Sequence, residues 1–215
     1  MDLGSVEIVV FSKPIIPFFM SEFSLYFNLG LDHVLDWQAY DHVMFLLVLV
    51  AAYSFNSWKR VLGLVSLFTL GHTLSLFLSV YGVVRVNIAW VEVLIALTIF
   101  ITAFYNIITA KRKEHHKNML LLYITTAFFG IIHGLGFSSY FKMISSNITG
   151  KFIPLLEFSL GIESAQIIVV ITALIFAFIF QNFFKVNRRD WILVISAIVI
   201  GVILPILIEN IKNLI

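Results

Sequence analysis

The chain has 215 residues, of which 60% are hydrophobic and only 12% are charged, and its mean hydropathy is +1.02. A water-soluble domain of this size carries about a quarter charged residues, so the composition excludes a soluble globular protein and predicts an all-α, polytopic membrane helix bundle. The net charge of +2 does not indicate a nucleic-acid partner, and the lack of cysteine excludes disulfides and thiolate metal sites.

The N-terminal segment, residues 1–36, has no basic region ahead of an apolar core, so we do not expect a cleaved signal peptide. Its aromatic-rich part, "IIPFFMSEFSLYFNLGLDHVL", predicts a helix that lies at the membrane interface or re-enters beside the first span. A further crossing is the alternative. No repeat or linker divides the chain, so we expect residues 1–215 to form a single membrane domain with its helix bundle over residues 37–209.

Six later stretches are long enough to cross a bilayer core of about 30 Å, which takes about 20 helical residues. They are Trp37–Phe55, Val61–Tyr81, Asn87–Ala110, Met119–Phe141, Pro154–Phe180 and Trp191–Glu209. The loops after the first, third and fifth of these spans hold nine of the 14 Lys and Arg residues. The positive-inside rule therefore places these loops in the cytoplasm and both termini on the outer side.

Ionisable side chains within the spans are the most informative feature, because each costs roughly 2.5–3.5 kcal/mol to insert. They are Asp41, His42, His72, Glu92, His133, Glu157 and Glu163, with His33 just before the first span. In the predicted orientation all of them fall in the outer half of the membrane. Scattered polar residues would not segregate in this way, so the pattern predicts a shared polar cavity that opens to the outside.

Imidazole nitrogen together with carboxylate oxygen suits a divalent metal ion such as Ni²⁺, Zn²⁺, Co²⁺ or Fe²⁺ rather than Ca²⁺ or Mg²⁺. The candidate ligands are His33, Asp41, His42, His72, His133 and Glu163. The residues expected to orient them are Gln166, Thr73, Glu92 and Glu157. The alternatives are structural: the histidines can be neutral and hydrogen-bonded between helices, Asp41 can stabilise a helix start, and Glu92 and Glu157 can reach water at the interface.

Four stretches carry a resemblance to a known family: "LGLDHVLDWQAYDHVMFLL", "LFTLGHTLSLFLS", "FFGIIHGLGFSSYF" and "LEFSLGIESAQ". In order and spacing they resemble the HupE/UreJ family of hydrogenase- and urease-accessory membrane proteins, which are regarded as nickel or cobalt permeases. The resemblance runs from about Phe27 to the C-terminus and implies a multi-pass protein of a bacterial-type inner membrane. The spacing of His33 and Asp41, with Phe129 and Gly136 beside the His-Gly motif, resembles the urease-accessory-like branch.

Position by position, the resemblance implies functional roles for the residues already singled out. His33, Asp41 and His42 match the family's first-helix element, and His72 and His133 match its two later histidine motifs. Glu163 and Gln166 match its Glu-x-x-Gln element, here "ESAQ".

The leading hypothesis is a divalent-metal permease that captures a nickel-like ion from the outer side. The runner-up is an intramembrane zinc-type hydrolase that acts on a lipid or lipoprotein, with Asp41 and Glu163 as acid and base candidates. A non-catalytic accessory membrane subunit is the third alternative. The expected partners are membrane lipids and the metal ion, together with either a second copy of the chain or accessory proteins of metalloenzyme maturation.

Overall fold

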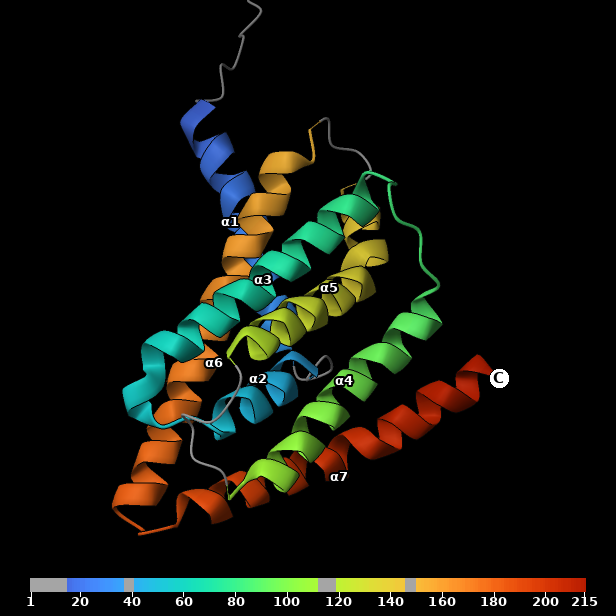
Figure 1. The fold of residues 1–215 in the computed structure, drawn as a ribbon. Helices are drawn as coiled ribbons and strands as arrows, with labels where there is room; N and C mark the ends of the chain where they lie inside the picture. The colour runs from blue at the N-terminus through green and yellow to red at the C-terminus, as the bar shows by residue number, and fades with distance from the viewer. Residues whose placement is uncertain (1–14, 37–40, 112–118, 146–149) are drawn as a thin grey trace, which may run out of the picture.

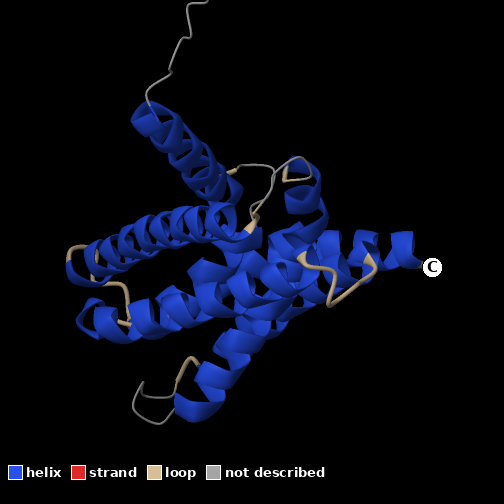
Figure 2. Ribbon diagram, turned by 90° about the horizontal axis from the view of Figure 1, so that it is seen from above, coloured by secondary structure: helices blue, strands red, loops and turns tan. Residues whose placement is uncertain are grey.

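A computed structural model of the protein describes residues 15–36, 41–111, 119–145 and 150–215. Every regular element in these residues is helical, which confirms the predicted all-α class (Figures 1 and 2). The helices are α1 (Ile15–Leu35), α2 (Asp41–Ala51), the short 3₁₀-helix η1 (Phe55–Ser57), α3 (Trp58–Val80), α4 (Ile88–Thr109), α5 (Met119–Ile144), α6 (Phe152–Asn182) and α7 (Arg188–Leu214).

Five helical segments in the described residues are long and apolar enough to cross a membrane, which confirms a polytopic helical bundle. They are Phe55–Val80, Ile88–Thr109, Met119–Ile144, Phe152–Asn182 and Arg188–Leu214. These segments cover the last five predicted spans.

The first predicted span, Trp37–Phe55, begins in residues 37–40, which lie outside the described residues, and its described part is not a complete crossing. Its helical part is α2, whose 11 residues extend about 16 Å, about half of a bilayer core. The Arg188 side chain donates a hydrogen bond to the carbonyl of Ala52, just past the end of α2, and Ser54 is extended (φ −93°, ψ 161°). A half-buried contact from an arginine and an extended residue, neither of which hydropathy predicts, therefore mark the early end of the helix.

The N-terminal segment is a 21-residue helix, α1, that packs along α6 rather than alone at an interface. The two helices approach closely where Gly30 meets Gly161: a methyl group at Gly161 would overlap the carbonyl oxygen of Phe27. In Figure 1, α1 descends beside the N-terminal part of α6, and α2 lies lower in the bundle and runs toward the start of α3. The C-terminal end of α1 and the N-terminal end of α2 therefore lie inside the bundle.

The main hydrophobic core surrounds α2, which packs against α4, α6 and α7. Phe45, Leu46 and Val48 of α2 are almost completely buried. The α3–α5 pair is the most extensive helix contact, and Gly134 makes it close: a side chain there would overlap the carbonyl oxygen of His72. This small residue fixes the position of α3 relative to α5, and with it two histidines of the candidate site.

Candidate metal site

Three histidines from three helices converge at the point where α1 and α2 meet. His33 lies in the last turn of α1, His42 in the first turn of α2, and His72 within α3. One ring nitrogen from each lies within 4.8 Å of the other two. The ring centroids of His33 and His42 are 4.7 Å apart, and those of His42 and His72 are 5.8 Å apart. We call these three residues the histidine trio.

His133 on α5 borders the trio, with its ring centroid 5.4 Å from that of His42. Its Nδ1 lies 2.8 Å from the carbonyl oxygen of Phe129, one turn earlier on the same helix. Because a carbonyl can only accept, Nδ1 carries the proton and Nε2 keeps its lone pair. This is the arrangement that a metal-binding imidazole adopts.

His42 is held by the carboxylate that precedes it. The Oδ1 atom of Asp41 lies 3.1 Å from Nδ1 of His42 and also accepts a hydrogen bond from the backbone N–H of His42 at 2.9 Å. Asp41 therefore fixes both the start of α2 and the ring of His42, and it leaves Nε2 of that ring directed away from the carboxylate.

The ring nitrogens that face the trio have no hydrogen-bond partner among the described residues. They are Nε2 of His33, Nε2 of His42, Nε2 of His133, and both nitrogens of His72. His42, His72 and His133 are almost completely buried. Because a buried polar atom without a partner costs about 1–3 kcal/mol, such a convergence indicates a ligand that these nitrogens bind. The donor set of neutral imidazoles fits a borderline transition metal.

Aromatic side chains surround the trio and keep the site apolar. The ring centroid of Phe137 lies 3.9 Å from that of His33, and the ring centroid of Phe68 lies 5.0 Å from that of His133. An apolar environment limits the access of water, so the three ring nitrogens rather than water molecules would coordinate an ion placed between them.

The other predicted ligand, Glu163, lies outside the trio. Its Oε1 accepts a hydrogen bond of 2.6 Å from Ser66 of α3. This contact belongs to a row of side-chain hydrogen bonds between α3 and α6, which also includes Thr69 to Gln166 at 2.7 Å and Thr73 to Ser159 at 2.9 Å. Gln166 therefore contacts α3 through its oxygen, while its Nε2 is buried and has no partner among the described residues.

The two remaining predicted residues, Glu92 and Glu157, are not part of the trio. Glu92 is exposed on α4, and Glu157 is half-buried on α6. Neither belongs to the group of side chains whose ligand atoms converge.

The structure also places two acidic residues at the site that the sequence analysis did not single out. Asp32 and Asp36 line a cavity of about 660 Å³ together with His33 and Tyr140. The two aspartates are four residues apart, so they share one side of the α1 C-terminus. Their positions on either side of His33 in the sequence could have identified them as site residues. Both precede the predicted spans, however, so they do not count as charges within the membrane. The cavity gives the trio an acidic opening.

The family model described as HupE / UreJ protein matches residues 15–209, which include the trio, the acidic opening and the α3–α6 contacts. No curated protein and no solved structure matches the chain. Since the match extends over nearly the whole chain, this protein belongs to the HupE/UreJ family.

Proposed function

We propose that this protein is a permease for a divalent transition-metal ion, with nickel or a similar ion as its cargo. The observation that carries the proposal is the histidine trio: three helices each direct an unpartnered ring nitrogen to one place. Nickel, cobalt, zinc and iron all accept imidazole ligands, so the donor set selects this class of ion but not one member. Membership of the HupE/UreJ family supports the same class.

The meeting of α1 and α2 supports transport in particular. Transporters bind ions where discontinuous helices end inside the membrane, because the carbonyl groups at a helix C-terminus attract cations. Here the C-terminus of α1 carries His33, and Asp32 and Asp36 add negative charge beside it. This end of the helix would attract the ion from the acidic opening and pass it to the trio.

An inward route is supported by the α3–α6 hydrogen bonds. Ser66 precedes His72 by six residues on α3, a displacement of about 9 Å toward the end of α3 that carries Lys59 and Arg60. The positive-inside rule assigns that end to the cytoplasm. Ser66 and Glu163 therefore offer oxygen ligands on the cytoplasmic side of the trio, where the ion would next bind.

Uptake into proteoliposomes tests the proposal. Purified protein is reconstituted, and accumulation of labelled Ni²⁺, Co²⁺, Zn²⁺ and Fe²⁺ is measured against empty vesicles. We expect flux of at least one of these ions, and its loss in His42→Ala, while His116→Ala in the basic loop after α4 makes the same chemical change without loss. Absence of flux for all four ions would refute a permease, and equal flux in both variants would show that the histidine trio is not on the transport route.

A specific observation favours an intramembrane metalloenzyme as the second candidate. A large apolar groove beside α2 shares Leu35 and Asp36 with the acidic opening, so a lipid could approach the trio from the side. A hydrolase predicts one tightly held zinc per chain that survives dialysis, whereas a permease predicts an exchangeable ion. Metal analysis of purified protein before and after dialysis against a chelator separates the two.

A further inference from the structure

A large apolar groove lies between α2, α6 and α7, on a different side of α2 from α3 and α5. Its volume is about 1170 Å³, and its walls include Val43, Leu47, Phe176, Ile195 and Ile198. It exists because α2 is only 11 residues long and α7 packs mainly along α4, which leaves the space beside α2 unfilled by protein.

The helices that form this groove favour the acyl chain of a lipid as its occupant. Its walls come from two helices that are long and apolar enough to cross a membrane and from the buried α2, so its open side faces lipid. Hydrocarbon fills such a space without leaving polar groups unsatisfied, whereas water would have almost no polar partner there.

One end of the groove carries polar features that select a headgroup. Val186 and Trp191 line that end, and Nε1 of Trp191 is buried and has no hydrogen-bond partner among the described residues. Lys185 precedes Val186 in the sequence, Arg189 follows it, and both side chains are exposed. These two positive charges outnumber the one neighbouring negative charge, that of Asp190. Arg188 is excluded from this role, because its guanidinium already binds the carbonyl of Ala52.

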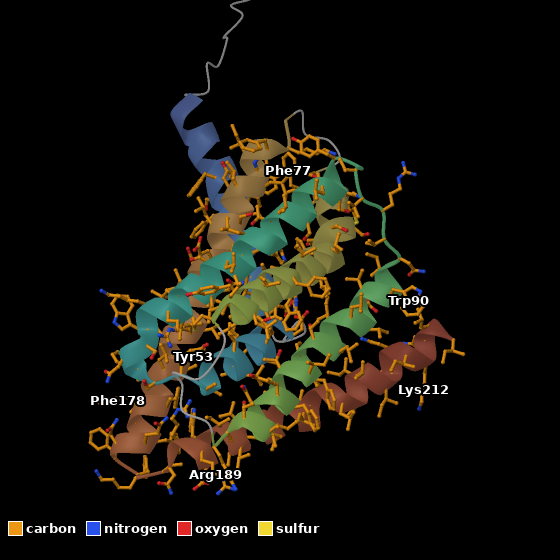
Figure 3. The ribbon with its side chains drawn as sticks, in the orientation of Figure 1. Tyr53, Phe77, Trp90, Phe178, Arg189 and Lys212 are labelled. Carbon is orange, nitrogen blue, oxygen red and sulfur yellow. The ribbon has the colours of Figure 1, made fainter. Side chains whose placement is uncertain are left out.

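This end of the molecule is the one that the positive-inside rule assigns to the cytoplasm. Figure 3 places Arg189 at the end where Tyr53 and Phe178 also lie, with Phe77 near the opposite end. Anionic lipids concentrate in the cytoplasmic leaflet, and basic residues at the membrane surface attract them by about 1 kcal/mol each. A phosphate here would meet two cations and an indole N–H donor.

We propose that the α2–α6–α7 groove is a binding site for one anionic phospholipid of the cytoplasmic leaflet. Its phosphate contacts Lys185, Arg189 and the Trp191 N–H, and an acyl chain fills the groove. Leu35 and Asp36 line both this groove and the acidic opening, so the chain end lies against the wall of the candidate metal site. The bound lipid closes the side of the site that protein leaves open.

Native mass spectrometry of the full chain tests the proposal. The protein is placed in nanodiscs of phosphatidylglycerol and phosphatidylcholine at equal amounts, released, and scored for the lipid that it retains. We expect one retained phosphatidylglycerol, favoured about tenfold over phosphatidylcholine, which corresponds to about 1.4 kcal/mol. Equal retention of the two lipids would overturn the proposal.

Matched variants locate the lipid. Lys185→Gln with Arg189→Gln removes two charges at the groove and should abolish the preference for phosphatidylglycerol. Lys59→Gln, at the start of α3, with Lys111→Gln, just after α4, removes two exposed charges assigned to the same leaflet but absent from the groove lining, and should leave the preference unchanged. An equal loss in both pairs would mean general surface attraction and would refute a defined site.

Two further measurements exclude other occupants. Ala173→Phe fills the groove and should remove the retained lipid of either class, with thermal unfolding as the check that the variant folds. A dimer that this variant converts to monomer would instead assign the groove to a second copy of the chain and overturn the proposal. Because His42→Ala leaves the groove intact, it should retain the lipid even if the protein transports no metal.

Discussion

At the scale of single residues, the candidate site depends on how each imidazole is oriented. Asp41 holds Nδ1 of His42, and the Phe129 carbonyl holds Nδ1 of His133, so in both rings Nε2 is the nitrogen left without a hydrogen-bond partner among the described residues. His72 has no hydrogen-bond partner on either nitrogen among the described residues. No hydrogen bond within the described part of the chain therefore orients the ring of His72, which is held by packing alone, whereas hydrogen bonds orient the rings of His42 and His133.

Asp41→Asn tests this orientation. An amide has nearly the same shape but carries no charge and can present a donor to Nδ1, which would favour the wrong tautomer of His42. Loss of such a carboxylate partner lowers metal affinity by about 10- to 100-fold, so we expect a loss of that size for Ni²⁺ or Zn²⁺ in equilibrium dialysis. Asp190→Asn, at the exposed start of α7, is the matched control. Unchanged affinity in Asp41→Asn would mean that the carboxylate does not orient the ring.

The residues of the trio could be named from the sequence because charged and imidazole groups in apolar helices are costly and therefore conspicuous. Their partners could not. The contact between His42 and Asp41 can be expected because the two residues are adjacent in the sequence. Ser66 and Glu163, by contrast, are 97 residues apart, and only helix packing brings them together. Asp32 and Asp36 were missed because hydropathy placed them outside the membrane, although the structure places them at the opening to His33.

At the scale of helices, the α3–α6 contact connects the trio to the half of the bundle that carries Lys59 and Arg60. Glu163→Gln keeps an oxygen that can accept from Ser66 but removes the negative charge that would receive the cation. We expect metal binding in detergent to stay unchanged while uptake into proteoliposomes falls about tenfold, equivalent to a barrier higher by about 1.4 kcal/mol. Glu209→Gln, exposed on α7, should change neither property. Full uptake by Glu163→Gln would remove this carboxylate from the route.

The α3–α5 contact determines where His72 and His133 lie relative to each other. Gly134→Ala places a methyl group against the carbonyl oxygen of His72 and the hydroxyl of Ser75, so the helices must separate. Overpacking of this kind costs about 1–3 kcal/mol, and we expect a lower thermal unfolding midpoint together with weaker metal binding. Gly201→Ala on α7 meets no atom within 4 Å and should be neutral or slightly stabilising, since alanine favours a helix. Equal midpoints for the two variants would show that this approach is not tight.

The helix bounds show why hydropathy predicted five spans well and the first one badly. A long apolar run surrounded by lipid can only be a helix, because every backbone group must find its partner within the segment. α2 differs because it packs against α4, α6 and α7, so these contacts and the hydrogen bond from Arg188 decide where it ends. Burial by protein and burial by lipid look the same in a hydropathy profile.

At the scale of the whole molecule, the direction of the proposed transport depends on the orientation of the bundle in the membrane. The acidic opening lies at the α1 side of the trio, and Glu163 with Ser66 lies toward the end that carries Lys59 and Arg60. If that basic end is cytoplasmic, an ion that passes from the opening to the trio and then to Glu163 moves inward. The orientation of the bundle in the membrane therefore determines whether the ion would move inward or outward, so a measurement of the orientation tests the direction of ion movement.

Cysteine labelling determines the orientation, and the chain suits it because it contains no cysteine of its own. Val83→Cys, in the turn between α3 and α4, and Asn56→Cys, in η1, place single thiols at exposed positions beyond opposite ends of α3. We expect a membrane-impermeant maleimide to label Val83→Cys in intact cells and Asn56→Cys only after permeabilisation. The reverse pattern would turn the acidic opening toward the cytoplasm, and the same chain of ligands would then predict export, measurable as metal release from loaded proteoliposomes.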